Sequence, residues 1–166
     1  MYKGALEGNR IIDLCRAGPG QRATGVLADY GADVITIVEP GLAERRQAGG
    51  AAPKGFGQVN HRNKRSMFLN MKTQGALDVF MKLVSRSDAI MESNRPGVAK
   101  KLGVDYASAK KANPGVVYVS LSGFGQHGPY ARVPGHDLSF QGLAGMIPMD
   151  EQGKPLMPSI NQADLN

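Results

Sequence analysis

The stretch that decides the fold is RIIDLCRAGPGQRATGVLADYGADVITIV, residues 10–38. It begins with a β-branched apolar run at residues 10–15, which a glycine- and proline-rich turn at residues 17–21 interrupts. Residues 22–30 then carry apolar side chains at helical spacing, and residues 34–38 form a second apolar run. This order predicts a β-α-β unit, in which the crossover helix makes the two strands parallel.

Strand and helix patterns keep alternating beyond this unit. The predicted strands are 66–71, 88–91 and 116–122, and the predicted helices are 73–85, 98–102 and 106–112. The last strand, VVYVSLS, has the composition of a buried strand, whereas residues 40–57 lack periodicity and predict an exposed loop. The alternation indicates an α/β fold with a doubly wound, mostly parallel sheet and helices on both faces. Ligands of such sheets bind beyond the carboxyl ends of the strands.

Composition narrows the class of protein. The 166 residues are 42% apolar, which favours one folded domain, and the net charge of +6 favours an anionic partner. The basic residues are scattered in short groups without interleaved aromatic residues, so a phosphate-bearing small molecule fits better than nucleic acid. The single cysteine, Cys15, excludes an internal disulfide and suits a reducing compartment; a buried apolar role is expected for it. Without an apolar leader or membrane-length run, the sequence predicts a soluble, cytoplasmic protein.

A glycine motif lies between the first predicted strand and helix. Residues 18–23, GPGQRA, match the pattern G-x-G-x-x-A, and Glu39 ends the next strand, as in a dinucleotide-binding site. Pro19 counts against this hypothesis because it removes a backbone N–H from the phosphate cradle. An NAD-binding domain therefore stays an alternative, beside a plain chain-reversing turn.

Two polar segments are candidates for phosphate contact. The group NHRNKRS, residues 60–66, places cations just before a strand. The segment Ser93-Asn94-Arg95 lies in a strand-to-helix turn, and Lys101 follows in the next helix, near enough to share an anion. Solvated turns would have a similar composition, so both interpretations stay open for these segments.

The segment around His136 and Asp137 is a candidate acid-base site. Histidine titrates near neutral pH and can both accept and return a proton, and Asp137 could orient its imidazole or cap the following helix. A second carboxylate, Asp164, follows the apolar run 156–160. The alternative is that His136 is only a helix-capping residue.

Together the segments RIIDLCRAGPGQ, NHRNKRSMFLNMKT, SDAIMESNRPGVAKKLGVDY and PGHDLSFQGLAGM resemble the family III CoA-transferases, which include the α-methylacyl-CoA racemases. The resemblance implies a Rossmann-like large domain, of which residues 1–166 are the N-terminal part, without the small domain and the C-terminal part. It also implies coenzyme A (CoA) chemistry without a metal, with acyl-CoA and possibly a carboxylic acid acceptor as partners. Subunits of this family interlock, so a homo-oligomer is expected.

The resemblance also assigns roles to individual residues. Asp164 matches the catalytic carboxylate of both branches, and His136 matches the racemase base. Contacts to CoA are implied for Arg16, Ala17, Lys64, Arg65, Ser93, Asn94, Arg95 and Lys101. The sequence departs from the family where Thr36 replaces a basic residue, Glu39 replaces an arginine that meets CoA, and Asn94 replaces an aromatic residue.

Three hypotheses follow for the activity. In a racemase, His136 and Asp164 would act as bases on the two faces of the carbon next to the thioester. In a transferase, Asp164 would attack the acyl-CoA carbonyl and His136 would orient the reacting groups. The third hypothesis is a catalytically inactive CoA-binding or assembly module, since a half-built site loses positioning and leaves apolar faces open to self-association.

Overall fold

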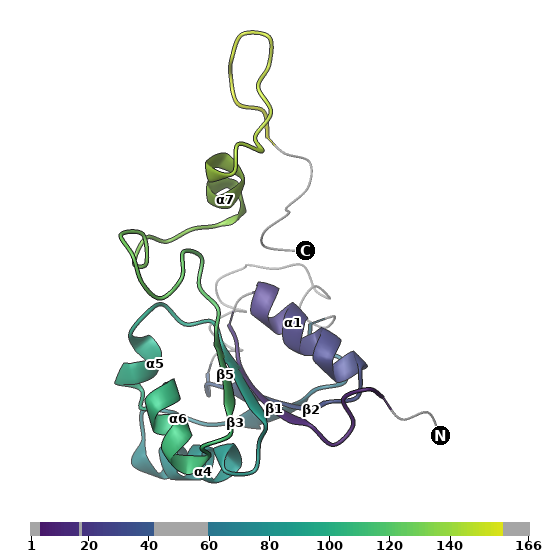
Figure 1. Cartoon of the computed structure of the whole chain (residues 1–166), viewed down its shortest axis with the longest axis vertical. Coiled ribbons are helices and arrows are strands. Elements are labelled where there is room, and N and C mark those ends of the chain that lie inside the picture. The colour runs from purple at the N-terminus through teal and green to yellow at the C-terminus, as the bar shows by residue number, and fades with distance from the viewer. Residues whose placement is uncertain (1–3, 17, 42–59, 158–166) are drawn as a thin grey trace. The chain divides into compact units, whose positions relative to one another are not determined.

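The computed structural model describes residues 4–16, 18–41 and 60–157. The chain divides into two compact units, Met1–Leu121 and Ser122–Asn166, which are described separately here (Figure 1). Most of the predicted loop 40–57 falls on residues 42–59, outside the described residues.

The first unit contains a parallel five-stranded sheet. Its strands are β1 (Arg10–Leu14), β2 (Asp33–Val38), β3 (Arg65–Phe68), β4 (Ala89–Glu92) and β5 (Val117–Ser120). Their order is β3-β2-β1-β4-β5, and every neighbouring pair is parallel. The predicted doubly wound α/β sheet is therefore confirmed. The order reverses between β1 and β4, which is the place where sheets of this topology bind ligands.

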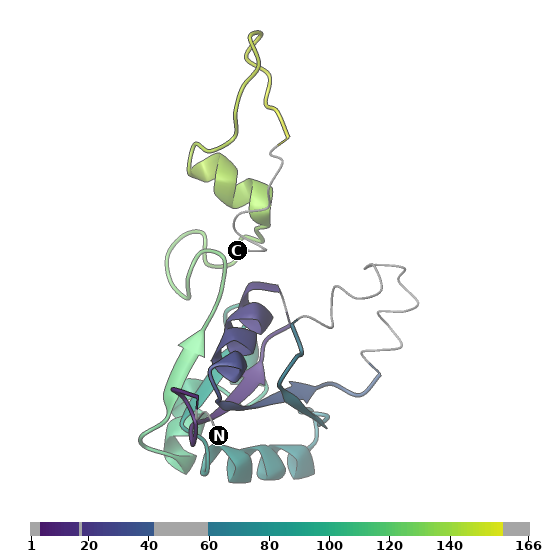
Figure 2. The same ribbon diagram turned by 90° about the vertical axis from the view of Figure 1, so that its right-hand side faces the viewer.

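Helices cover both faces of this sheet. They are α1 (Gly18–Asp29), α4 (Gln74–Val84), α5 (Val98–Lys101) and α6 (Tyr106–Ala112). Figure 2 shows α1 and α4 on opposite sides of the strands. Because side chains alternate along a strand, Ile11 packs in the α1 layer with Val34, whereas Ile12 packs with Phe80 and Ile90 in the α4 and α6 layer.

The start of α1 differs from the prediction. The glycine- and proline-rich turn was expected to separate β1 from a helix beginning at Arg22, but α1 begins at Gly18 and takes in Pro19 and Gly20. Proline is compatible with the first turn of a helix because backbone N–H groups there have no acceptor within the helix, so the N–H that proline lacks is not needed. The motif is therefore the first helical turn, and β1 leads almost directly into it.

The prediction of a buried last strand is wrong. Strand β5 is shorter than expected, and the side chains of Val117 and Val119 are 60% and 38% exposed. Among the described residues, β5 pairs only with β4 and forms an edge of the sheet. An apolar β-branched run indicates a strand that is suited to burial, but it does not show whether other residues of this chain pack over that strand.

The second unit is built around a short helix, α7 (Asp137–Leu143). The ring of Phe140 packs against Phe124, with the ring centroids 5.2 Å apart. A Cβ atom on Gly123 or Gly135 would lie 2.6 or 2.7 Å from Phe140 Cζ, so these glycines let the loop close over the ring. A helix follows His136 as predicted, but it begins at Asp137 and its N-cap is His136, so Asp137 is not the capping residue.

None of the helices in the described part of the chain combines the length and the apolar character needed to cross a bilayer.

Candidate functional site

Polar residues meet at the carboxyl ends of β1 and β4, where the strand order reverses. The backbone N–H of Arg16 donates to Ser93 Oγ at 2.8 Å, which joins the two turns. The backbone N–H and the side-chain amide of Asn94 both donate to Glu92 Oε2, at 2.7 and 2.9 Å. Glu92 is buried, so these hydrogen bonds hold Asn94 at the sheet edge.

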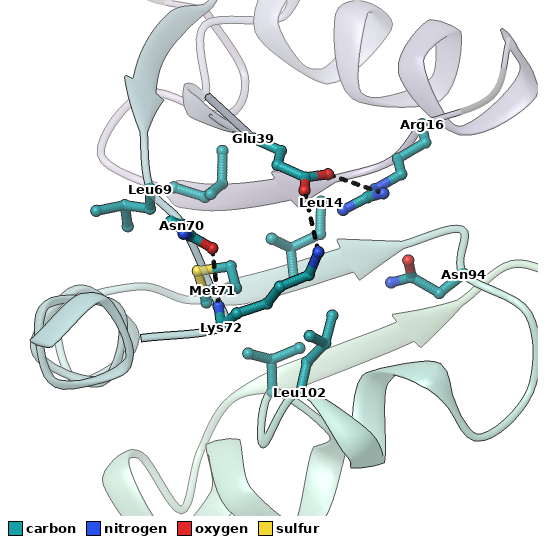
Figure 3. A pocket seen from close by; sticks show the side chains of 11 residues that line it. Leu14, Arg16, Glu39, Leu69, Asn70, Met71, Lys72, Asn94 and Leu102 are labelled. Atoms are coloured by element: carbon teal, nitrogen blue, oxygen red, sulfur yellow. Dashed lines mark hydrogen bonds and ion pairs between the residues drawn. The ribbon is translucent and has the colours of Figure 1, made fainter. Parts of the chain in front are cut away.

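A pocket opens at this edge of the sheet (Figure 3). Its apolar lining comes from the strands and from the segments around α4 and α5: Leu14, Ile37, Leu69, Met71, Leu102 and Val104. Its polar lining consists of Arg16, Glu39, Asn70, Lys72 and Asn94. An apolar floor beside charged groups suits a ligand with a ring or alkyl portion and a phosphate portion.

Three charged residues of this pocket form what we call the Glu39 triad: Arg16, Glu39 and Lys72. Glu39 Oε2 lies 3.5 Å from Arg16 Nη1, and Glu39 Oε1 lies 3.6 Å from Lys72 Nζ (Figure 3). The carboxylate is 23% exposed, while the side chains of Arg16 and Lys72 are 51% and 72% exposed. Two accessible cations therefore flank one partly buried anion, and the triad as a whole is positive.

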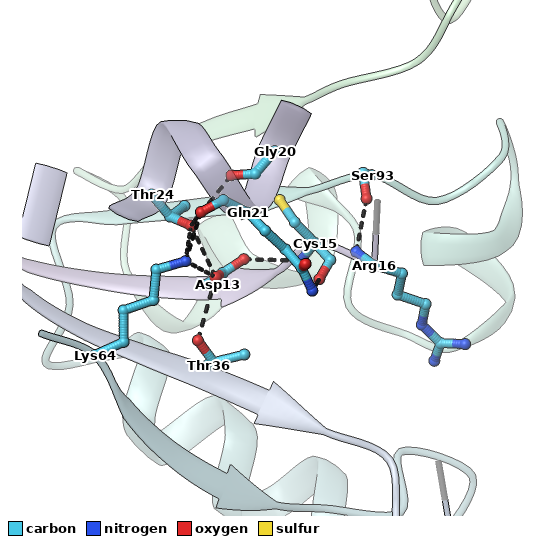
Figure 4. Close-up of polar contacts among 9 residues, drawn as sticks. All are labelled: Asp13, Cys15, Arg16, Gly20, Gln21, Thr24, Thr36, Lys64 and Ser93. Atoms are coloured by element: carbon cyan, nitrogen blue, oxygen red, sulfur yellow. Dashed lines mark hydrogen bonds and ion pairs between the residues drawn. The ribbon is translucent and has the colours of Figure 1, made fainter. Parts of the chain in front are cut away.

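A second polar group lies inside the unit, between β1, β2 and α1 (Figure 4). We call it the Asp13 cluster; it contains Asp13, Thr24, Thr36 and Lys64. Lys64 Nζ lies 3.0 Å from Asp13 Oδ2 and 2.6 Å from Thr24 Oγ1, and it donates to the Gln21 carbonyl at 2.7 Å. Both side chains of the ion pair are shielded from solvent, at 1% and 0% exposure for Lys64 and Asp13.

The Asp13 cluster also fixes the backbone that leads to the pocket. Asp13 Oδ1 accepts a hydrogen bond from the Cys15 N–H at 2.9 Å, and Gln21 Nε2 donates to the Cys15 carbonyl at 3.2 Å. Arg16 follows directly, so the cluster sets the point from which the Arg16 side chain starts. The side chain of Cys15 is buried, as expected. Burial and the neighbouring Asp13 raise the pKa of its thiol.

The structure brings together some of the predicted CoA contacts. Arg16, Ser93 and Asn94 meet at the pocket edge. Arg95 and Lys101 are exposed in the turn after β4 and in α5, and neither belongs to the pocket lining. Ala17 lies outside the described residues.

Lys64 and Arg65 are not brought to this pocket. Lys64 is held in the Asp13 cluster. Arg65 Nη2 lies 2.6 Å from Asp33 Oδ1 at the start of β2, so it lies at the amino ends of the strands, opposite to the pocket. Arg10 Nε pairs with the same carboxylate at 2.7 Å. Burial works to raise the pKa of Asp33, but the hydrogen bonds and charges of Arg10 and Arg65 outweigh it, so the pKa is lowered.

The predicted catalytic residues fall in the second unit. His136 is exposed and forms the N-cap of α7; its backbone N–H donates to Ser139 Oγ at 3.5 Å. Asp137 is buried and accepts a hydrogen bond from Gln141. Asp164 lies outside the described residues, so its pairing with His136 stays a prediction.

Lys72 is the charged residue of this pocket that the sequence interpretation missed. It follows β3, and its backbone N–H donates to Asn70 Oδ1 at 3.2 Å in the turn before α4. The signal was its position in the turn between the predicted strand 66–71 and the following helix, because such a turn lies at the carboxyl ends of the strands, where ligands bind.

The structure also explains Gly20 without a dinucleotide. A Cβ atom at this position would lie 2.6 Å from Cys15 Sγ and 3.5 Å from Leu121 Cδ2, so protein atoms fill the space that a pyrophosphate would need. The NAD-binding alternative thus loses the observation on which it rested.

Comparisons with known proteins agree on one family. The sequence pattern of CoA-transferase family III matches residues 6–165. The chain is 37% identical over 149 residues to the acetyl-CoA:oxalate CoA-transferase of Acetobacter aceti, covering 87% of this chain and 38% of the relative. It is 34% identical over 143 residues to the human α-methylacyl-CoA racemase, covering 86% of this chain and 35% of the relative.

Solved structures give the same result. A hypothetical protein from Mycobacterium tuberculosis superposes with a TM-score of 0.85 at 31% identity, covering 98% of this chain and 46% of that one. A CaiB/BaiF family protein from Brucella suis gives a TM-score of 0.84 at 30% identity, with 99% and 46% coverage. The chain thus spans less than half the length of these relatives. Within that span, the pattern match over residues 6–165 shows that the chain belongs to CoA-transferase family III.

Proposed function

We propose that this chain is the N-terminal part of an acyl-CoA-processing enzyme, and that its first unit binds the CoA thioester at the carboxyl edge of the sheet. The observation that carries the proposal is the pocket in which the exposed cations Arg16 and Lys72 lie beside an apolar floor. The names of two relatives, an acetyl-CoA:oxalate CoA-transferase and an α-methylacyl-CoA racemase, indicate the same substrate class.

The proposed contacts follow from the chemistry of each group. Arg16 and Lys72 pair with phosphate oxygens of the ligand, since charge-assisted hydrogen bonds to phosphate are strong. Asn94 offers its side chain at the pocket wall, and Arg95 and Lys101 add positive charge in the turn and helix that follow. The apolar floor takes the adenine ring or the pantetheine arm of CoA.

Calorimetry with CoA tests this binding mode. We expect Arg16→Ala and Lys72→Ala each to weaken binding by about tenfold, which corresponds to about 1.4 kcal/mol for one lost charge-assisted contact. Lys82→Ala is the matched control, because Lys82 is exposed in the last turn of α4, away from the pocket. Absence of CoA binding by the wild-type chain would contradict the proposal, and so would equal losses in all three variants.

We propose that His136 and Asp164 carry out the chemistry. In a racemase, both would act as bases on the two faces of the carbon next to the thioester. In a transferase, Asp164 would be the nucleophile and His136 would orient the reacting groups. Racemisation predicts exchange of the substrate α-hydrogen with deuterated water, and His136→Ala should abolish that exchange. Transfer predicts an Asp164 acyl intermediate that hydroxylamine traps. Exchange that persists in His136→Ala would remove His136 from the reaction.

The second candidate is that the 166-residue chain by itself binds CoA without turnover, because it spans less than half of each relative described above. An assay with and without a supplied C-terminal part of a relative separates the two candidates. Turnover by the chain alone would contradict the inactive module.

A further inference from the structure

We infer that Asn94, oriented by the buried carboxylate of Glu92, recognises the adenine base of CoA through a pair of hydrogen bonds. Asn94 accepts one bond from the amino group of adenine and donates the other to the neighbouring ring nitrogen. The inference rests on the proposed CoA site, and it names the group in that site that selects the base. It concerns a position at which the sequence departs from the aromatic residue that the family resemblance implies.

Glu92 fixes the direction in which the amide group of Asn94 faces. Glu92 is buried at the end of β4, and its Oε2 atom accepts hydrogen bonds from the backbone N–H and from Nδ2 of Asn94, at 2.7 and 2.9 Å. The reverse orientation would place Asn94 Oδ1 against Glu92 Oε2, and a carboxylate oxygen and an amide oxygen are both acceptors. The amide of Asn94 is therefore held in one orientation.

The same two contacts determine what the amide can still offer to a ligand. Because the backbone N–H and Nδ2 reach one oxygen, the Nδ2 hydrogen in this contact is the one that points back toward the main chain of Asn94. The other Nδ2 hydrogen lies beside Oδ1, which accepts no hydrogen bond from the residues that the structure describes. Asn94 thus presents one acceptor and one donor side by side, and its amide extends from the turn after β4 into the pocket (Figure 3).

This pair of groups matches one edge of adenine. The amino group and the neighbouring ring nitrogen form an adjacent donor and acceptor, and asparagine pairs with both of them where proteins read adenine in DNA. The amides of the pantetheine arm do not match, because the N–H and C=O of a trans amide point in opposite directions. Leu102 and Val104 line the same pocket and supply apolar contact for the faces of a flat ring.

The turn that carries Asn94 is also fixed before a ligand binds. The Arg16 backbone N–H donates to Ser93 Oγ at 2.8 Å, which links the turn to the end of β1, and Asn94 itself is half-buried. Binding of the base therefore orders little of the protein. A base with the wrong edge leaves polar groups in the pocket without partners, which costs affinity.

Calorimetry of the wild-type chain with CoA and with its hypoxanthine analogue tests the inference. In the analogue an oxygen replaces the amino group and the neighbouring N1 carries a hydrogen, so the order of donor and acceptor on this edge is reversed. Glu92 prevents the amide of Asn94 from turning round to match the reversed edge. We expect the wild type to prefer CoA by about tenfold.

Three variants test the two residues. Asn94→Leu removes the hydrogen-bonding groups at similar volume, and the preference for CoA should fall to less than about twofold. Glu92→Met keeps Asn94 but releases its amide, and the preference should fall to less than about threefold. Asn9→Leu is the matched control, because Asn9 is exposed directly before β1, at the opposite end of the strands, and it should keep the wild-type preference.

The outcomes separate this inference from the proposed function. A wild type that binds both ligands equally overturns base recognition and leaves CoA binding in place, whereas a wild type that binds neither ligand overturns both. An Asn94→Leu variant that keeps the preference, or loses affinity for both ligands equally, removes Asn94 from base recognition. A Glu92→Met variant that keeps the preference overturns the positioning role of Glu92. The wild-type comparison does not depend on the folding of any variant.

Discussion

At the scale of single residues, Gly20 lacks room for a side chain because the first turn of α1 packs on Cys15. A Cβ atom there would lie 2.6 Å from Cys15 Sγ and 2.9 Å from Cys15 Cβ. Gly25, one and a half turns later in the same helix, has no neighbouring atom closer than 3.7 Å to the corresponding position. Two glycines of one helix therefore differ only in what surrounds them.

This difference predicts opposite effects of the same substitution. Gly20→Ala should destabilise the chain by about 1–3 kcal/mol, because the new methyl group overlaps Cys15 in a packed turn. Gly25→Ala should stabilise it by about 0.5–1 kcal/mol through lower backbone entropy of the unfolded chain. Urea denaturation of the two variants measures both effects.

The Cys15→Ala background supplies the control, because it removes the nearer of the two overlapping atoms. Gly20→Ala should cost less there than in the wild type. An equal cost in both backgrounds would show that another contact limits position 20.

Residue type alone did not determine which basic residue serves the pocket. Lys64 and Arg65 are adjacent in one basic segment, yet Lys64 pairs with Asp13 in the interior and Arg65 pairs with Asp33 at the opposite sheet edge. Both partners lie more than 30 residues earlier in the chain. The sequence indicates that such cations pair with carboxylates, but only the folded structure shows which carboxylate each cation contacts.

At the scale of elements, the Asp13 cluster ties the segment before β3 to β1 and α1. Lys64 reaches across to Asp13 and to the carbonyl of Gln21 in the first turns of α1. Removal of the lysine would leave the Asp13 carboxylate buried without its cation, which is a costly arrangement.

Lys64→Met should therefore lower the free energy of unfolding by about 3–5 kcal/mol, as measured by urea denaturation. Lys82→Met is the matched control at an exposed helical lysine and should change it by less than about 0.5 kcal/mol. The double variant Asp13→Asn with Lys64→Met should lose less than the sum of the single losses, because the partners act as a pair. Additive losses would show that the two side chains do not interact.

The order of elements followed from the sequence, but their ends and surroundings did not. Alternating apolar runs predicted the parallel strands and the helix α6 (Tyr106–Ala112) to the residue. The start of α1 was predicted too late, because proline and glycine occur both in turns between elements and in the first turn of a helix. The exposure of β5 was missed because an apolar strand carries no information on what covers it.

At the scale of the whole molecule, β5 carries exposed apolar side chains at an edge of the sheet. Val117 and Val119 are opposite Ala89 and Met91 in the register with β4, and Tyr118 between them donates its hydroxyl hydrogen to the Val104 carbonyl on the other face. An uncovered apolar strand edge pairs readily with another chain. The relatives described above are more than twice as long as this chain, so they have additional sequence available to cover such a strand.

We therefore expect the 166-residue chain to self-associate at micromolar concentration through β5. The combined substitution Val117→Lys with Val119→Lys should shift it toward the monomer, because two cations on one strand oppose both burial and pairing. Val79→Lys is the matched control: Val79 is 43% exposed on α4, and a lysine there should leave association unchanged. Sedimentation velocity measures the distribution of species. A wild-type chain that sediments as a monomer would contradict the expectation. Association that persists in the double variant would place the contact elsewhere than on β5.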